Sequence, residues 1–211
     1  MPGYMRGVFA GANGNEETAA LGLLAGINAA RCALRPPPVI IGREAGYIGT
    51  LVDDVARGEG LPYRMPNAWV TDRTQIRNDN ADLRLTPLAG QLGLVDRSWV
   101  AAVEQKRAEL EVVVAALRRL RVFPSAATNR RLASAGIAPL SAEMTAEWLL
   151  RRPTVSYAQL QRALDLPEVL PAVAALVEIT IRYEHTGRRR QTAHAASDSK
   201  VLEASQGETG Q

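Results

Sequence analysis

The sequence predicts a mainly α-helical protein with a small α+β part at its N-terminal end. Apolar residues make up 46% of the 211 residues but only 5% are aromatic, so the core must be built from alanine, leucine and valine. A composition rich in alanine, leucine, arginine and glutamate favours helices. Residues 6–30 predict the α+β part, because a short apolar run, a glycine turn and a helical pattern follow one another there. A chain of this length forms one domain or one and a half.

The segment 6–30 begins with an apolar run at 7–10 that is consistent with a buried strand end. A tight turn follows, made of Gly11, Ala12, Asn13 and Gly14. We expect Asn15 to cap the next helix, whose first turn carries Glu16 and Glu17, where carboxylates complement the helix dipole. The small residues of this helix would let a neighbouring backbone lie close to it. A strand, a glycine turn and a helix N-terminus can together cradle a phosphate or the polar edge of a ring.

Three prolines at 36–38 force an extended linker, and a second helical face follows within residues 42–65. Asp53 and Asp54 lie in that segment. Adjacent residues point about 100° apart on a helix, so the two are not a general acid/base pair. We interpret them as solvated or capping carboxylates.

A capped turn leading into a short helix is predicted just before the middle of the chain. The short side chains of Asn80 and Asp82 can bond nearby backbone N–H groups, as turn formers do. Thr86 then fits an N-cap, with Pro87 at the first helical position and Gly93 closing the helix.

Residues 96–123 form the strongest predicted helix, because apolar residues recur there every seven positions. Ser98 can cap this helix and Pro124 ends it. The helix is either a member of a bundle or a subunit contact, and the sequence leaves both open. Its last turn carries three arginines, which suit the helix dipole or, alternatively, a phosphate patch. They are Arg118, Arg119 and Arg121.

Residues 125–187 have the pattern of several small helices. Ser141 or Thr145 can cap one of them, and Ser156 can cap another. Residues 177–183 alternate strictly between apolar and polar, which taken alone favours a strand.

Several classes of protein are excluded by the sequence. It contains no run of about 18 apolar residues that could span a membrane, and no secretion signal. Cys32, the only cysteine, excludes an internal disulfide, fits a reducing, cytoplasmic compartment and is interpreted as a small buried residue. His185 and His194 are expected to be exposed and inert, so a zinc site of Cys/His type is excluded. The polar tail, 188–211, is expected to be disordered.

Arginine dominates the basic residues, with 23 arginines against two lysines and a net charge of +3. The guanidinium group suits bidentate contacts with phosphate. A genome of high G·C content would produce the same bias, and both explanations stay open.

Two stretches resemble the MnmG/GidA family, the flavoprotein subunit of the enzyme that modifies the tRNA wobble uridine with a carboxymethylaminomethyl group. They are DNADLRLT at 79–86 and GLVD at 93–96. Further similar stretches lie at 6–30, at 42–65 and, as LLRRPTVSYAQL, at 149–160. The resemblance covers roughly residues 6–190.

The resemblance implies a remnant of a flavin-binding domain edge followed by a helical domain. The parts are the end of a FAD-binding domain (1–35), a connecting α+β segment (36–95), a helical domain (96–187) and the tail (188–211). Residues 177–183 correspond to a helical region of the family, so we predict a helix there.

The resemblance also implies candidate site residues. The family's glycine turn lies against the flavin, which implies FAD contact through Gly11, Ala12, Asn13 and Gly14, with Ala12 in place of a family glutamine. The family's tRNA-facing motif aligns with residues 66–76, where Trp69 and Asp72 replace an arginine and a tyrosine. The candidate tRNA-binding residues are Arg64, Arg73, Arg77 and Arg84. No catalytic residue and no metal ligand is assigned.

The implied function is modification of the tRNA wobble uridine, by a truncated and divergent member that does not act unaided. The family has a GxGxxG unit, a nicotinamide-binding insertion and a C-terminal bundle, and none of these resembles a stretch of this sequence. The implied partners are tRNA and either a second copy or a chain that supplies the flavin domain. The family's GTPase partner would contact the bundle that this sequence does not resemble. The alternatives are a non-catalytic tRNA-binding or dimerisation module, or a decayed fragment without function.

Overall fold

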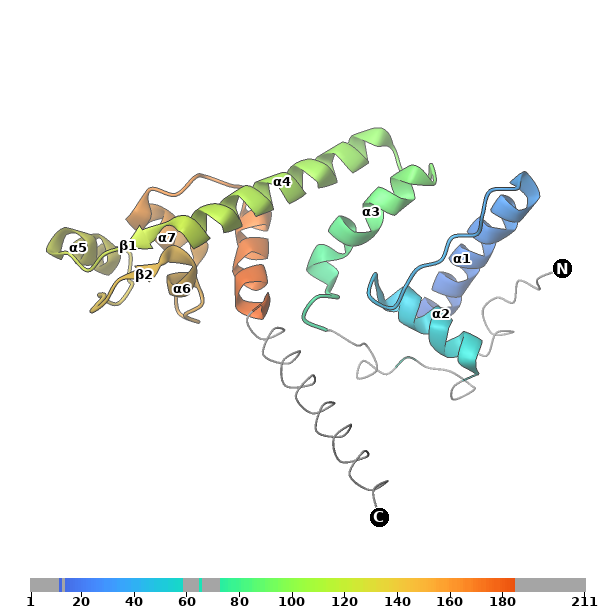
Figure 1. Ribbon diagram of the computed structural model, residues 1–211, viewed down its shortest axis with the longest axis horizontal. Helices are drawn as coiled ribbons and strands as arrows, with labels where there is room; N and C mark the ends of the chain where they lie inside the picture. The colour runs from blue at the N-terminus through green and yellow to red at the C-terminus, as the bar shows by residue number, and fades with distance from the viewer. Residues whose placement is uncertain (1–11, 13, 59–64, 66–72, 185–211) are drawn as a thin grey trace, which may run out of the picture. The chain divides into compact units, whose positions relative to one another are not determined.

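The computed structural model describes residues 12, 14–58, 65 and 73–184. The chain divides into a first unit, 1–92, and a second unit, 93–211. The helices and strands of both are labelled in Figure 1. The described residues are mostly helical, with one two-stranded sheet among them, which confirms the predicted mainly α-helical class. The predicted strand end, the segment 66–72 and the tail lie outside the described residues.

The first unit contains α1 (Asn15–Leu34) and α2 (Tyr47–Arg57), which contact each other. α1 begins at Asn15 with Gly14 as its N-cap, so the cap lies one residue before the predicted one. The two glutamates lie in the first turn of α1 as predicted. A small apolar cluster, built around Leu21 of α1 and Leu51 of α2, joins the two helices.

An extended segment returns along α1 after Arg35, which adopts a left-handed conformation with φ of 73°. The Asn28 side chain holds this segment: its Nδ2 donates to the Val39 carbonyl oxygen at 3.0 Å, and the Val39 N–H donates to its Oδ1 at 2.7 Å. The Asn28 amide thus satisfies both backbone groups of Val39, as a strand partner would. The three prolines are thereby placed beside α1.

Gly49 is the position in the first unit where two backbones approach most closely among the glycines. A Cβ atom at Gly49 would lie 2.0 Å from the carbonyl oxygen of Gly42 and 2.8 Å from that of Ile41. In contrast, apart from the neighbouring residues and backbone of α1 itself, no atom of the described chain lies within 4 Å of a Cβ added at Gly22 or Gly26. Among the described residues, the backbone therefore packs closely against another segment at Gly49 of α2, and not at Gly22 or Gly26 of α1.

The turn η3 (Asn78–Asn80) leads directly into α3 (Ala81–Gln91). The predicted start at Thr86 is therefore wrong, and Pro87 lies inside the helix. Proline has no N–H to donate to the carbonyl four residues earlier, and its typical cost in a helix interior is about 3 kcal/mol. The hydrogen bonds that Arg84 donates to Asn80 and to the Ala45 carbonyl stabilise the start of this helix and oppose the cost.

The second unit is built on α4 (Arg97–Arg119). Asp96 is its N-cap residue, so Ser98, the predicted cap, lies within the first turn. The helix ends before the predicted Pro124, because the backbone becomes extended at Leu120.

A two-stranded antiparallel sheet follows, in which β1 (Arg121–Val122) pairs with β2 (Met144–Thr145). The Ala146 N–H also donates to the Leu120 carbonyl oxygen at 2.9 Å, which continues the pairing. Arg121 is thus a strand residue and not part of the last turn of α4 as predicted.

Short helices complete the second unit. They are α5 (Ala126–Ser134), α6 (Ala146–Leu150), α7 (Tyr157–Leu164) and an unlabelled helix at 171–184. Thr145 caps α6 by accepting the Trp148 N–H, whereas Ser141 does not cap it. Ser156 caps α7 as predicted. The helix at 177–183 is confirmed.

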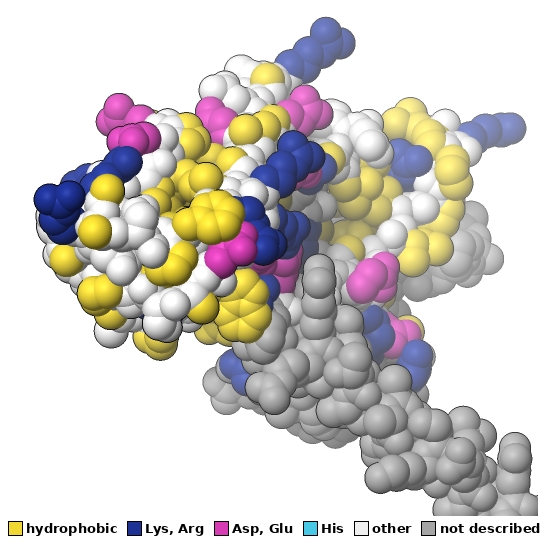
Figure 2. Space-filling view, turned by 60° about the vertical axis from the view of Figure 1, so that its left-hand side comes forward, with side chains coloured by type: hydrophobic (Ala, Val, Ile, Leu, Met, Phe, Trp, Pro, Cys, Tyr) yellow, Lys and Arg dark blue, Asp and Glu magenta, His cyan; other side chains and the backbone are white. Residues whose placement is uncertain are grey.

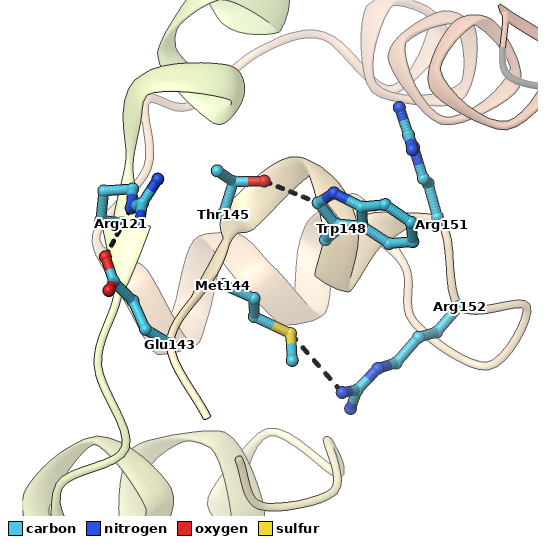
Figure 3. A pocket seen from close by; sticks show the side chains of 7 residues that line it. All are labelled: Arg121, Glu143, Met144, Thr145, Trp148, Arg151 and Arg152. Carbon is cyan, nitrogen blue, oxygen red and sulfur yellow. Dashed lines mark hydrogen bonds and ion pairs between the residues drawn. The ribbon is translucent and has the colours of Figure 1, made fainter. Parts of the chain in front are cut away.

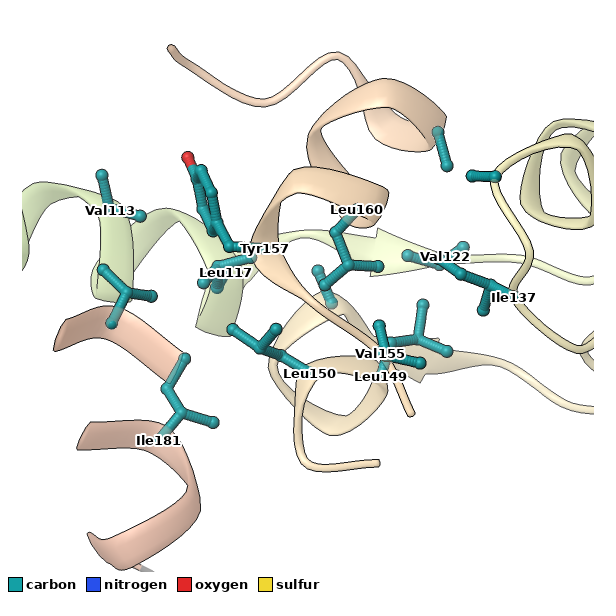
Figure 4. Close-up of a cluster of buried hydrophobic side chains, with 14 of the residues drawn as sticks. Val113, Leu117, Val122, Ile137, Leu149, Leu150, Val155, Tyr157, Leu160 and Ile181 are labelled. Carbon is teal, nitrogen blue, oxygen red and sulfur yellow. The ribbon is translucent and has the colours of Figure 1, made fainter. Parts of the chain in front are cut away.

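The core of the second unit explains why residues 177–183 are helical. Val173, Val177 and Ile181, spaced four apart, are buried in it, and this spacing fits one face of a helix. Figure 4 shows Ile181 in the same cluster as Leu117 of α4 and side chains from α6 and α7. Burial of this helical stripe prevails over the alternation that favours a strand.

Candidate nucleic-acid interface

Arg84, a predicted tRNA-binding residue, holds the start of α3 in place. Its Nε donates to Asn80 Oδ1 at 3.0 Å and its Nη2 to the Arg77 carbonyl oxygen at 3.1 Å. Its Nη1 donates to the carbonyl oxygen of Ala45, just before α2. Burial, and then the nearby charge of Arg77, lowers the pKa of Arg84 below its ordinary value. These three contacts tie the turn, α3 and the segment before α2 together.

Arg77 lies beside Arg84 and is also engaged by the chain. Its Nε pairs with Asp79 Oδ1 at 3.0 Å, and its Nη1 donates to the Thr74 carbonyl oxygen at 2.5 Å. Only 14% of its side chain is exposed. The structure therefore brings Arg77 and Arg84 together, places Arg73 as an exposed residue just before them, and leaves Arg64 outside the described residues.

The predicted cofactor turn is described at two of its four positions. Ala12 is buried at 1% exposure in the cluster between α1 and α2, and Gly14 is the N-cap of α1. Gly11 and Asn13 lie outside the described residues. Glu17, in the first turn of α1, accepts the Met65 N–H at 3.1 Å.

This helix start does not fit the phosphate groups of a flavin dinucleotide. Two carboxylates, those of Glu16 and Glu17, stand in the first turn, where an anion would otherwise gain from the helix dipole. Repulsion between these carboxylates and a pyrophosphate opposes binding.

The interpretation of Asp54 as a solvated or capping carboxylate is wrong, and so is that of Cys32 as a buried residue. Asp54 is buried at 2% exposure and pairs with Arg43, which also binds Asp53 at 2.8 Å. The hydrogen bond from Arg43 lowers the pKa of Asp53 below its ordinary value. The hydrogen bonds that Arg43 donates to Asp54 and Asp53 raise the pKa of Arg43. Arg43 supplies the positive charge that the buried carboxylate of Asp54 requires, because a buried charge is unfavourable without a partner. Cys32, in the last turns of α1, is exposed rather than buried.

The second unit has a pocket that the sequence did not predict, with a volume of about 600 Å³ (Figure 3). It is lined by residues of β1, β2, α6 and the turn after α6. They are Arg121, Glu143, Met144, Thr145, Trp148, Arg151 and Arg152. Pairing of β1 with β2 brings Arg121 beside the segment at 143–145, and the cap at Thr145 starts α6 on the same side. Three arginines against one glutamate give the lining an excess of positive charge.

Each charged group of this pocket has a defined environment. Arg121 Nε and Glu143 Oε1 pair at 2.5 Å, and this hydrogen bond holds the pKa of Glu143 below its usual range. The Arg151 guanidinium lies over the Trp148 ring, 4.6 Å from its centroid, and its Nη2 binds Glu147 Oε1 at 2.7 Å. This stacking of a cation on an indole fixes both side chains.

Arg152 points toward Met144, whereas Arg151 extends away from Met144, as Figure 3 shows. The Arg152 Nη2 contacts the Met144 sulfur at 3.6 Å. The sequence showed Arg151 and Arg152 only as the end of a helix before Pro153. The available signal was a tryptophan three residues before an arginine pair, since aromatic and arginine side chains together suit nucleic acids.

Basic side chains also lie beside exposed hydrophobic ones over the face of the second unit that Figure 2 shows. Among the described residues, no group of His, Cys, Asp and Glu side chains could hold a metal ion. None of the described helices is both long enough and apolar enough to cross a membrane.

The helical second unit is similar to a domain that occurs in tRNA modifying enzymes. Its residues 98–191 match the family model described as the tRNA modifying enzyme MnmG/GidA C-terminal helical domain. The chain is 54% identical over 181 residues to the tRNA uridine 5-carboxymethylaminomethyl modification enzyme MnmG of Roseiflexus sp. (strain RS-1). It is 48% identical over 182 residues to the enzyme of the same name from Chloroflexus aurantiacus. Each match covers 85% of this chain.

A solved structure of Aquifex aeolicus GidA has a similar fold, with a TM-score of 0.72 and 27% sequence identity. That match covers 92% of this chain and 30% of the other. The chain therefore belongs to the MnmG/GidA family. It spans 27% of the Roseiflexus relative and 28% of the Chloroflexus relative.

Proposed function

We propose that the chain takes part in carboxymethylaminomethyl modification of the tRNA wobble uridine, as a divergent portion of the enzyme that does not act alone. The observation that carries this proposal is its 54% identity, over 85% of its length, to a tRNA uridine modification enzyme. In this role the chain binds tRNA, and a larger assembly supplies the surface that holds FAD. That surface comes from a second copy or from a chain with a flavin domain.

The tRNA contacts of the first unit would centre on Arg73, with Arg64 as a further contact and with Arg77 adding its charge from a side chain that is only 14% exposed. Arg73 is exposed, and Arg77, four residues later, is the N-cap residue of η3. Arg84 would act indirectly, because its donors already hold Asn80 and the backbone of Ala45. Its part is to present the turn in a fixed conformation.

A non-catalytic tRNA-binding or dimerisation module is the second candidate. Val112 of α4 and Leu170 are 66% and 67% exposed and line one hollow of the second unit. Exposed apolar side chains gathered in one place are typical of contacts between proteins. A homodimer formed through this face would be compatible with either function.

Binding of a tRNA transcript to the purified chain tests the proposed function. Arg73→Ala together with Arg77→Ala should weaken binding by about 1–3 kcal/mol, the range for charge-assisted hydrogen bonds and unsatisfied partners. The affinity of the unaltered chain should fall steeply between about 50 and 200 mM salt, because phosphate contacts release counterions. Filter binding over a salt series measures both effects.

The matched control replaces Arg35 and Arg57, two exposed arginines of the same unit, with alanine. This variant loses the same charge and should bind tRNA nearly as well as the unaltered chain. Equal weakening by both double variants would show that only net charge matters. Failure of the unaltered chain to bind tRNA would contradict the proposal.

A further inference from the structure

Two arginines of the second-unit pocket have hydrogen-bond donors that the described chain does not fill. Within the described residues, the acceptor for the Arg152 guanidinium is the Met144 sulfur, at 3.6 Å. A thioether is a weak acceptor, whereas a guanidinium carries five N–H donors. Arg151 Nε is buried and has no acceptor in the described part of the chain. An unmade hydrogen bond to a charged group is unfavourable, so this pocket is suited to an anionic ligand.

Trp148 gives the same pocket a flat apolar surface. Its side chain is 54% exposed although it is the largest apolar residue of α6. The Arg151 guanidinium is stacked on the indole, 4.6 Å from the ring centroid, so the indole is held in one orientation. Exposed aromatic rings that are fixed in this way stack on the bases of single-stranded nucleic acids.

The size and charge of the pocket restrict its ligand further. A volume of about 600 Å³ lies within the range of small-molecule sites and is too small for a folded partner. The Arg121–Glu143 pair neutralises itself at one side, which leaves Arg151 and Arg152 as the excess positive charge. Glu147 offsets part of the charge of Arg151 through its ion pair at 2.7 Å. Arg152 is thus the main anion-binding group.

We propose that this pocket binds one unstacked nucleotide of an RNA strand. The base stacks on Trp148, and Arg152 donates hydrogen bonds to the adjacent phosphate. The inference rests on the proposed function for its choice of RNA over an acidic peptide. The joint presence of a flat aromatic surface and a fork of donors favours a nucleotide, because an acidic peptide needs only the charge.

Fluorescence of Trp148 tests the proposal on the full chain. Trp69→Phe and Trp99→Phe leave Trp148 as the only tryptophan. Hexauridylate should quench its emission, and a blunt RNA duplex of equal charge should quench it less, because duplex bases are already stacked. Arg152→Gln should weaken hexauridylate binding at least fivefold. Arg130→Gln, which removes an exposed charge from the same unit, should change it less than twofold.

A second variant probes the competing carboxylate. Glu143→Gln removes the ion-pair partner of Arg121, so Arg121 becomes available to the RNA phosphate. Binding should become roughly two- to fivefold tighter, in keeping with the modest strength of exposed ion pairs. Unfolding curves of every variant show whether the fold is retained. If Arg152→Gln does not fold, Arg152→Lys keeps the charge and loses the planar fork, and it should still bind more weakly.

The outcomes separate this inference from the proposed function. Quenching of Trp148 together with selective weakening by Arg152→Gln supports the nucleotide site. If the chain binds tRNA but Trp148 emission does not change and Arg152→Gln equals Arg130→Gln, the pocket proposal is overturned and the proposed function stands. If neither tRNA nor hexauridylate binds, both are overturned. If a polyglutamate peptide quenches Trp148 and hexauridylate does not, the ligand is an acidic protein segment and the nucleotide proposal is overturned.

Discussion

Arginine side chains serve two different purposes in this chain. Arg43 and Arg84 donate to groups of their own unit, where they compensate a buried carboxylate and fix a turn. Arg152 is oriented toward a pocket and contacts a weak acceptor. The sequence alone could not separate these purposes, because all three are arginines in polar surroundings. The distinction depends on which acceptors the fold brings within hydrogen-bonding distance.

Tyr157 leads to a prediction about alkaline pH. It is 1% exposed, its hydroxyl donates to the Pro167 carbonyl oxygen at 2.8 Å, and burial raises its pKa. At neutral pH, Tyr157→Phe should lower the free energy of unfolding by about 1 kcal/mol. Above the ordinary tyrosine pKa of about 10, the unfolded state loses its proton first, so the native chain loses stability as pH rises. The difference in the free energy of unfolding between the native chain and Tyr157→Phe should therefore become smaller as the pH rises.

Urea unfolding at neutral pH, and again on either side of pH 10 (the ordinary value), measures this difference. Tyr183→Phe serves as the control, because Tyr183 is 45% exposed. A gap between native chain and Tyr157→Phe that stays constant over this range would show that Tyr157 ionises alike in both states.

At the scale of elements, the sequence predicted helices and several caps correctly. Ser156 and Thr145 cap their helices because a hydroxyl directly before a helix can accept a hydrogen bond from a backbone N–H group of its first turn. The start of α3 was misplaced because Thr86–Pro87 has the form of a helix start, whereas the contacts of Arg84 begin the helix earlier. One of those contacts joins Arg84 to Ala45, which lies 39 positions earlier in the chain, so no local pattern contains it.

Glycines in α1 and α2 lead to a second prediction. Gly49→Ala should destabilise the chain by about 1–3 kcal/mol, the usual cost of overpacking, because its Cβ would meet backbone atoms that cannot rotate away. Gly26→Ala places the same methyl group on α1 with no described atom within 4 Å. It should stabilise the chain by about 0.5–1 kcal/mol, as alanine does in a helix interior.

Far-UV circular dichroism during urea unfolding compares the two glycine variants with the native chain. Opposite signs of the two changes are expected. Similar destabilisation by both would mean that the backbone contact of Gly49 does not matter, or that Gly26 has a contact outside the described residues.

At the scale of the whole molecule, the two units differ in how much core they contain. The buried cluster of the second unit draws on α4, α6, α7 and the helix at 171–184. The first unit has a cluster of three buried residues, with a few partly buried neighbours. The pocket residues are contributed by segments that pair across β1 and β2, strands of two residues each. Strands this short give no periodic signal, which is why the helical class was predictable and the pocket was not.

The larger core predicts that the second unit folds independently. A fragment of residues 93–211 should show a helical circular dichroism spectrum and a cooperative urea transition, because its buried cluster is contained within it. A fragment of residues 1–92 should unfold gradually, since a small core buries too little surface to offset the entropy of ordering. A non-cooperative transition for 93–211 would contradict this prediction.

The exposed thiol of Cys32 has a practical consequence. Because the chain has one cysteine and it lies on α1, a maleimide dye attaches at a single defined place in the first unit. In the variant that keeps only Trp148, excitation of the indole can transfer energy to that dye from the second unit. One protein molecule then carries a donor and an acceptor, and the transfer efficiency reports whether RNA alters the separation of the two units.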